Sequence, residues 1–202
     1  MTGSDEVRSR CFASVVDELE ARVRIEDALY RHSRGIDRND TVIRASAYHD
    51  DATVDAGAGP QPVADLLAVR GREHEHTRHT AHSVSNVLIE FISARVAFVE
   101  SHVLAGELED ADYDYSWRGF QPGPAGARIL SWGRYLDVFE RRDGDWRIRH
   151  RAVVYGDTSF DPLESAPPLP PRFLHQRHGP GDPIDQLRAQ AHEVARELED
   201  QA

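Results

Sequence analysis

The stretch LYRHSRGIDRND, residues 29–40, ends a helical segment and carries two side chains suited to acid–base chemistry. Apolar residues recur at helical spacing through residues 15–34, and Gly35 is a typical helix stop. Tyr30 and Asp37 lie seven residues apart, which is two helical turns, so they share one face if the helical path continues past Gly35. The same face carries three apolar residues, Val16, Leu19 and Val23. We therefore expect this face to be buried, with both functional side chains directed into the protein.

The remainder of the chain carries the pattern of strands. Polar and apolar residues alternate in residues 82–92 and again in 95–107, which is the period expected for β-strands. Residues 128–141 and 145–156 flank Arg142-Asp-Gly-Asp145, a strong signal for a β-hairpin. Helices followed by consecutive antiparallel strands predict an α+β fold, in which helices cover one face of a bent sheet. Such a sheet can curl around a pocket.

Three regions differ in composition. Residues 1–13 are predicted to be a flexible N-terminus and residues 14–158 the folded domain, whereas residues 159–202 begin with a Pro-rich linker and end in a helical extension. Within the domain, residues 108–127 are rich in Gly, Pro, Asp and aromatics, and loops of this length are usually functional or disordered. A mobile lid and a disordered insert are both compatible with its aromatic residues, Trp117 and Phe120.

Composition excludes several classes of function. The chain has 202 residues and 40% hydrophobic content, which suits one domain with tails. All 24 basic residues are arginine, so lysine Schiff bases, lysine-anchored pyridoxal phosphate and the phosphate-loop lysine are excluded. The formal net charge of −11 argues against a nucleic-acid partner, which would require a basic surface.

Location and redox chemistry follow from two further observations. No apolar run is long enough for a membrane span, and the polar N-terminus lacks the apolar core of a signal peptide, so a cytoplasmic location is expected. A lone Cys11 excludes an internal disulfide framework and a Cys-rich zinc site.

The run His74-Glu-His76-Thr-Arg-His79-Thr-Ala-His82 invites a metal interpretation. Only His76/His79 and His79/His82 suit one helical face, and no HExxH motif is present. We therefore expect a solvated, His-rich helix end rather than a metal site.

Four runs together resemble one family: RIEDALYRHSRGIDRND, AYHDDATVDAG, TAHSVSNVLIE and GRYLDVFERRDGDWRIRHRAVVYGD. Over about residues 22–158 the chain is similar to the SnoaL-like branch of the nuclear transport factor 2-like superfamily, which includes scytalone dehydratase and bile acid 7α-dehydratase. The resemblance implies a cone-shaped barrel with helices packed on a curved, mostly antiparallel sheet around a deep apolar cavity. It implies the reaction weakly, because the superfamily also contains isomerases, a dehydrochlorinase, polyketide cyclases and non-catalytic proteins. Subunits that pair through the outer face of the sheet imply a homodimer or homotrimer.

The resemblance assigns roles to three residues. In the dehydratases an Asp ends the first long helix, a His begins the following strand and a Tyr lies on the helix, which Asp37, His82 and Tyr30 match. His82 would act as general base, since an imidazole titrates near neutral pH, and Asp37 would orient it. Tyr30 would hydrogen-bond a substrate carbonyl. The structural alternative is a hydrogen-bonded strand histidine beside a helix-end carboxylate.

Five further residues are predicted to contact a substrate: Tyr48, Asn86, His102, Arg134 and His150. His102, Arg134 and His150 lie on strand faces whose other residues are mainly apolar, so each is expected to point into the cavity. His102 stands where the resemblance implies a Tyr, and it would replace the second acid of a dehydratase. Satisfied core histidines and a surface salt bridge remain the alternatives for these residues.

These observations favour a cofactor-independent lyase of the dehydratase type, or an isomerase, acting on an apolar cyclic small molecule. Two alternatives are a non-catalytic ligand-binding or subunit protein of the same fold and a polyketide-type cyclase. An enzyme requires Tyr30, Asp37 and His82 to converge at a cavity of roughly 300–1,000 Å³, whereas a purely structural protein would fill that space with side chains.

Overall fold

The computed structural model describes residues 11–73, 76–113, 121–165, 170, 172–179 and 181–199. It confirms an α+β architecture, in which helices accompany a six-stranded sheet. The helices are α2 (Val15–Asp37), α3 (Thr41–Ala45), α4 (Val63–Glu73) and α5 (Pro183–Glu199). The strands are β1 (Tyr48–Asp55), β2 (Pro60–Pro62), β3 (Thr77–Ser93), β4 (Val96–Glu109), β5 (Ala127–Arg142) and β6 (Asp145–Pro162).

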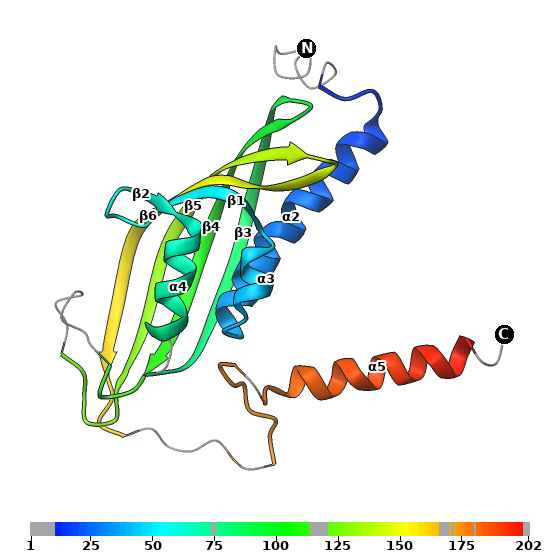
Figure 1. Ribbon diagram of the computed structural model, residues 1–202. Coiled ribbons are helices and arrows are strands. Elements are labelled where there is room, and N and C mark those ends of the chain that lie inside the picture. The colour runs from blue at the N-terminus through cyan, green and yellow to red at the C-terminus, as the bar shows by residue number, and fades with distance from the viewer. Residues whose placement is uncertain are drawn as a thin grey trace.

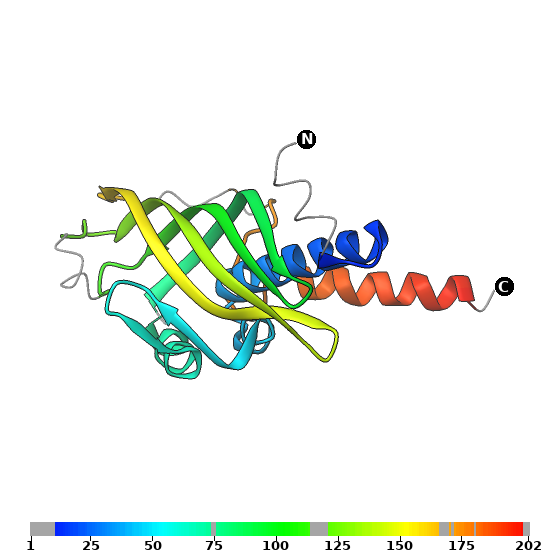
Figure 2. The ribbon, with the colours of Figure 1, turned by 90° about the horizontal axis from the view of Figure 1, so that it is seen from above.

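The sheet has the order β2-β1-β6-β5-β4-β3 and is mostly antiparallel. Strands β3 to β6 follow one another as a meander, β1 adds to β6 in parallel, and β2 pairs with β1. The sheet curls without closing, and α2, α3 and α4 lie on one side of it (Figure 1, Figure 2). This arrangement confirms the predicted curved sheet with helices on one face, and it makes β3 an edge strand.

Helix α2 extends three residues beyond the predicted segment 15–34. Ser14 caps its start, because the Ser14 hydroxyl accepts a hydrogen bond from the Asp17 amide at 3.1 Å. The helix then passes through Gly35 and ends at Asp37, so the prediction that Gly35 stops it is wrong. Gly35 is there for packing: a Cβ at this position would lie 2.5 to 2.6 Å from atoms of Arg44 in α3.

Replacing Gly35 with alanine is therefore expected to destabilise the protein by about 1–3 kcal/mol, because the added methyl group would push α3 away from α2. Urea unfolding would measure this change. As a control on the same helix, Val16→Ala should alter the free energy of unfolding by less than about 0.5 kcal/mol, since Val16 is 72% exposed. Equal effects of the two substitutions would contradict the packing role of Gly35.

The buried face of α2 is not the one expected from the apolar stripe. The buried residues follow a second helical stripe, made of Ala21, Ile25, Ala28, Leu29, His32, Ser33, Gly35 and Ile36. The predicted stripe faces outward, with Val16, Leu19, Val23 and Tyr30 exposed by 72%, 56%, 66% and 51%. The inner stripe alternates large side chains such as Ile25 and Leu29 with small ones such as Ala21 and Ala28, which suits close packing against the sheet.

A β-bulge in β3 reverses the alternation on which the strand prediction rested. Ser85 pairs with His102 and Leu88 with Glu100, so Asn86 and Val87 together oppose one residue of β4. Asn86 has a φ of 49°, a conformation that Asn tolerates well. Beyond the bulge the inward residues are Ile89 and Phe91, whereas Leu88 and Ile92 are exposed. Asn86 is therefore an exposed bulge residue and not part of a substrate-binding face.

A second bulge places Arg151 rather than His150 inside. Phe139 pairs with Ile148 and Val138 with His150, so Arg149 is an extra residue in β6. Ile148 and Arg151 are consequently buried, and His150 turns toward Thr53, whose hydroxyl lies 2.7 Å from its Nδ1. The prediction that His150 points into the cavity is wrong for this reason.

Strands β4 and β5 bury the faces opposite to those predicted. Ala97, Val99, Ser101 and Val103 face inward on β4, as do Ile129, Tyr135, Asp137 and Phe139 on β5. His102 and Arg134, which pair across the two strands, are exposed, and Arg134 forms an ion pair with Glu100 at 2.8 Å. Both strands carry apolar residues on both faces, so alternation could not identify the inner face.

Outside the sheet, α5 has no buried residue and extends away from the remainder (Figure 1). None of the described helices combines the length and apolar character needed to cross a membrane. The predicted lid residues Trp117 and Phe120, and His74 of the histidine run, lie outside the described residues.

Candidate active site

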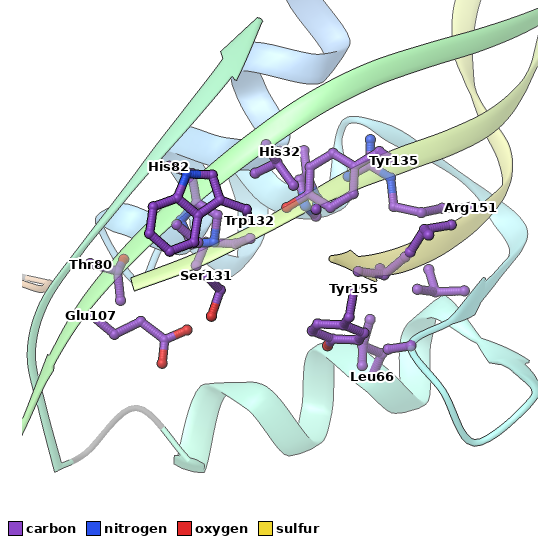
Figure 3. A pocket seen from close by; sticks show the side chains of 18 of the residues that line it. His32, Leu66, Thr80, His82, Glu107, Ser131, Trp132, Tyr135, Arg151 and Tyr155 are labelled. Carbon is purple, nitrogen blue, oxygen red and sulfur yellow. The ribbon is translucent and has the colours of Figure 1, made fainter. Parts of the chain in front are cut away.

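A cavity of about 430 Å³ lies between the helices and the curved sheet. Residues of α2, α3, α4, β1 and β3–β6 line it, and its apolar wall includes Ile36, Val54, Leu66, Val103 and Val153. Polar side chains reach it from several elements, among them His32 of α2 and His82 of β3 (Figure 3). Its volume lies in the range typical of small-molecule sites, so the described side chains leave room for a ligand.

His82 and Asp37 form the hydrogen-bonded pair expected from the sequence. The Nδ1 of His82 lies 2.7 Å from Oδ1 of Asp37, and the side chains are only 9% and 15% exposed. Asp37 also accepts the Thr80 hydroxyl at 2.8 Å and the backbone amide of His82 at 3.0 Å. The end of α2 is thereby tied to the edge of β3 by one carboxylate.

This geometry selects the charge of Asp37 and the tautomer of His82. Burial by itself would raise the pKa of Asp37, but hydrogen bonds and charge from His82, together with the Thr80 hydroxyl, lower it overall. An ionised Asp37 accepts the proton on Nδ1, so the lone pair of His82 is on Nε2. None of the described residues hydrogen-bonds Nε2, and His82 lines the cavity. The pair is arranged to accept a proton from a bound molecule.

A second polar pair, His32 and Tyr48, is buried at the same cavity. The Tyr48 hydroxyl lies 2.9 Å from Nδ1 of His32, and the His32 ring packs edge-on against both Tyr48 and Tyr135. Burial, and then the charges of Arg151, Arg44 and His82, lower the pKa of His32 well below its usual value. His32 is thus a neutral hydrogen-bonding group at neutral pH.

Because of His32, lowering the pH below about 6.5 is expected to destabilise the protein. The folded-state pKa of His32 lies well below the ordinary 6.5, so the unfolded chain binds a proton that the folded chain does not. Stability present above pH 6.5 is therefore lost as the pH falls from 6.5 toward the folded value. Urea unfolding at a series of pH values should show a shallower dependence for His32→Gln.

The exposed His102→Gln variant is the control and should keep the wild-type pH dependence. His79 and His178 also have a lowered pKa, first because of burial, so the slope should shrink without vanishing in His32→Gln. An unchanged slope in His32→Gln would contradict the buried neutral state.

A buried ion pair lies on the sheet side of the cavity. Arg151 donates from Nε and Nη2 to the two carboxylate oxygens of Asp137, each at 2.7 Å, and both side chains are at most 1% exposed. Its guanidinium carbon lies 3.9 Å from the centre of the Tyr135 ring. Burial alone would lower the pKa of Arg151, but the charge of Asp137 raises it. Burial raises the pKa of Asp137 against the effect of Arg151, yet two N–H groups accepted by one carboxyl are the geometry of an ionised pair.

Arg151 has one further donor group beyond the two that bind Asp137. Its Nη1 is buried and has no hydrogen-bond partner among the described residues. Arg151 and Arg44 both line the cavity, and burial raises the pKa of the neighbouring Tyr135 to about 12, so that phenol stays neutral. This region of the cavity favours a negatively charged or electron-rich group of a ligand.

The structure thus brings together only part of the predicted site. His82 and Tyr48 line the cavity and Asp37 is hydrogen-bonded to His82, whereas Tyr30 is 51% exposed on the outer face of α2. Asn86, His102, Arg134 and His150 are not among the lining residues. The prediction that Tyr30 meets Asp37 and His82 at the cavity is therefore wrong. Tyr30 and Asp37 share a helical stripe, but only the C-terminal end of that stripe, at Asp37, is covered by β3.

His32, Arg151 and Asp137 are site residues that the sequence pattern did not indicate. His32 lies four residues from both Ala28 and Ile36, so it belongs to the stripe that is buried, and that spacing could have found it. Arg151 and Asp137 had no such local signal. Across the described parts of the chain, no group of three or more His, Cys, Asp or Glu side chains is arranged to hold a metal ion.

Comparison with known proteins gives one family and several structural relatives. The SnoaL-like domain family matches residues 17–152. Among solved structures, a type 2 hexachlorocyclohexane dehydrochlorinase (LinA) aligns with a TM-score of 0.61 and 25% identity, over 79% of this chain and 100% of its own. A proposed scytalone dehydratase from Novosphingobium aromaticivorans gives 0.60 and 20%, over 83% and 98%. A LinA-type3 dehydrochlorinase from Novosphingobium barchaimii gives 0.60 and 24%, over 78% and 100%. No curated protein sequence matched.

Proposed function

Since the chain belongs to the SnoaL-like family and has the nuclear transport factor 2-like fold, we propose that it is a cofactor-independent enzyme acting on an apolar, cyclic small molecule. Its reaction would be an elimination of the dehydratase type or an isomerisation. The observation that carries this proposal is the His82–Asp37 pair, whose proton-accepting nitrogen is held at the wall of an otherwise mainly apolar cavity.

The first step would be removal of a proton from a carbon adjacent to a carbonyl, or adjacent to the carbon that bears the leaving group. Nε2 of His82 takes the proton, and the imidazolium that forms is stabilised by the ionised Asp37. The electron pair left behind forms a double bond. When the carbonyl oxygen gains negative charge, the Tyr48 hydroxyl and the Arg151 guanidinium are the lining groups suited to stabilise it.

The second step would return the proton. The imidazolium of His82 can protonate a leaving hydroxyl, so that water departs, or another carbon of the enolate, which completes an isomerisation. A leaving halide departs with the electron pair of its bond, and the proton on His82 then passes to solvent. His102, which the sequence offered as the second acid, and His150, offered as a substrate contact, are not among the residues that line the cavity, so they are not part of this scheme.

The relatives support an elimination more than a binding role. Two are hexachlorocyclohexane dehydrochlorinases and one is a proposed scytalone dehydratase, so each name describes loss of a small group from a ring compound. The cavity of about 430 Å³ has room for a ligand of that class.

A panel of carbon acids would test the proposal. The panel contains hexachlorocyclohexane, scytalone, cyclic β-hydroxyketones and 5-nitrobenzisoxazole, an apolar bicycle that opens to a coloured phenolate when a base removes its ring proton. Elimination, or exchange of a carbon-bound proton for solvent deuterium, is expected for at least one compound. Tight binding without either reaction across the panel would favour the non-catalytic ligand-binding alternative.

A further inference from the structure

A segment beyond the sheet returns to the His82–Asp37 pair. Residues 172–179 and 181–182, here called the C-terminal strap, follow the end of β6 at Pro162 and precede α5. The family match ends at residue 152, before the strap begins. None of its residues lines the cavity.

The strap contacts the residues on either side of Asp37. Gln176 donates from Nε2 to the backbone oxygen of Thr80 at 2.5 Å, and Asp182 lies 3.6 Å from Nε of Arg38. Thr80 is the residue whose hydroxyl donates to Asp37, and Arg38 follows Asp37 in the chain. The strap therefore contacts two residues that adjoin the Asp37 carboxylate: Thr80 on the edge strand β3 and Arg38 at the end of α2.

The strap lies against β3, which is the edge strand of the sheet. Strand β3 has no neighbouring strand on its outer side, so alternate backbone groups there lack a partner in the sheet. Asp37 accepts the outward amide of His82, and Gln176 donates to the outward carbonyl of Thr80. The helix end and the strap thus satisfy neighbouring groups of one exposed edge.

The strap is itself a folded turn. Asp182 is only 7% exposed, and its carboxylate accepts the backbone amides of Arg177 at 2.9 Å and Ile184 at 3.1 Å. Burial alone would raise the pKa of Asp182, but these two amides and then Arg38 lower it overall. The half-buried His178 lies close enough to Asp37 that the charge of Asp37 acts on its pKa. An ionised Asp182 holds the turn closed beside the site.

The low exposure of Asp37, compared with the rest of its helical stripe, also indicates that the strap covers it. Asp37 lies two turns after Tyr30, on the stripe whose preceding members are more than half exposed, yet its own side chain is only 15% exposed. Two neighbours distinguish it from the rest of that stripe: the edge of β3 and the strap.

We propose that the C-terminal strap positions Asp37 against His82, with Gln176 and Asp182 as the positioning residues. The strap restrains Thr80 and Arg38 and limits the access of water to the carboxylate, so the Asp37–His82 hydrogen bond stays formed. The catalytic part of this inference rests on the proposed function, but the structural part does not.

The test uses the full chain and a spectroscopic signal that needs no substrate. The Nδ1 proton of His82 should give a downfield NMR signal, assigned by its loss in His82→Gln. In Gln176→Ala and Asp182→Ala we expect this proton to exchange with solvent about five- to tenfold faster, the effect of losing one hydrogen bond that supports the site. Leu187→Ala on α5, where Leu187 is 55% exposed, is the matched control and should leave exchange unchanged.

A second measurement separates positioning from folding and from the proposed function. With 5-nitrobenzisoxazole as probe, kcat should fall in both strap variants while KM stays constant, because the strap does not line the cavity. Gln176 is exposed, so Gln176→Ala should keep the wild-type urea midpoint. Unchanged exchange in Gln176→Ala and Asp182→Ala would overturn the positioning role. Faster exchange in a protein that acts on no compound of the panel would support the strap and reject the proposed function instead.

Discussion

Replacing His82 with glutamine is expected to lower turnover by about 10²–10⁴-fold, the usual contribution of a general base. Glutamine keeps a hydrogen-bonding side chain at this position but cannot take up a proton. Because His82 lies on an edge strand and is stabilised mainly by Asp37, the variant should remain folded. Initial rates with any active compound of the panel, including 5-nitrobenzisoxazole, would measure the loss of turnover. Circular dichroism would show whether the variant is folded.

Two matched variants sharpen this test. Asp37→Asn should also lower kcat, by less than His82→Gln, because an amide can still contact Nδ1 but no longer stabilises the imidazolium. Tyr30→Phe should leave the rate unchanged, since Tyr30 is 51% exposed on the outer face of α2. Full activity of His82→Gln would remove the base assignment, and a large loss in Tyr30→Phe would contradict the geometry of the site.

Replacing Arg151 with methionine is expected to destabilise the protein by about 3–5 kcal/mol, the cost of leaving a buried carboxylate without its partner. Asp137 would then be a fully buried group that has lost both 2.7 Å hydrogen bonds. Tyr135 would also lose the guanidinium stacked on its ring. Urea unfolding monitored by tryptophan fluorescence would give the difference, since Trp146 is buried in the core.

The double variant Arg151→Met/Asp137→Leu distinguishes the energy of the pair from the cost of an orphaned charge. Two apolar side chains of similar volume leave no buried charge, so most of the stability should return. The exposed pair Arg134–Glu100 is the control, because Arg134→Met should cost no more than about 1 kcal/mol. If the double variant were as unstable as Arg151→Met, the intact ion pair itself would be stabilising, and the loss in Arg151→Met would not come from an unpaired buried carboxylate.

The charge of Arg151 can also affect turnover, which unfolding experiments do not measure. The double variant would retain His82, Asp37 and Arg44 but remove the guanidinium of Arg151 from the cavity wall. Its turnover therefore shows whether charge beside Tyr135 contributes to the reaction, independently of the base.

Periodicity alone was sufficient for the architecture. Helical spacing before residue 35 and strand alternation after residue 82 predicted an α+β fold, which the six-stranded sheet confirms. The hairpin at Arg142-Asp-Gly-Asp145 is present, with Asp143 and Gly144 in left-handed conformations at φ values of 51° and 89°. These features depend on neighbours within a few residues, so a local pattern contains the information they need.

The inner faces of α2 and the strands could not be predicted in the same way. Helix α2 carries two apolar stripes, and β4 and β5 have apolar residues on both faces. Single extra residues in β3 and β6 then exchange the inner and outer faces partway along each strand. For this reason Asn86, His102, Arg134 and His150 lie outside, while Arg151 lies inside.

The sequence by itself determined the architecture, the absence of lysine chemistry and the contact between Asp37 and His82. Only the tertiary structure decided which other groups reach the cavity, namely His32, Tyr135 and Arg151 with its partner Asp137, and that the strap lies beside Asp37. The physical reason is distance along the chain. Bulges and a returning C-terminal segment place a side chain through contacts with residues dozens of positions away, and no periodic pattern records those contacts.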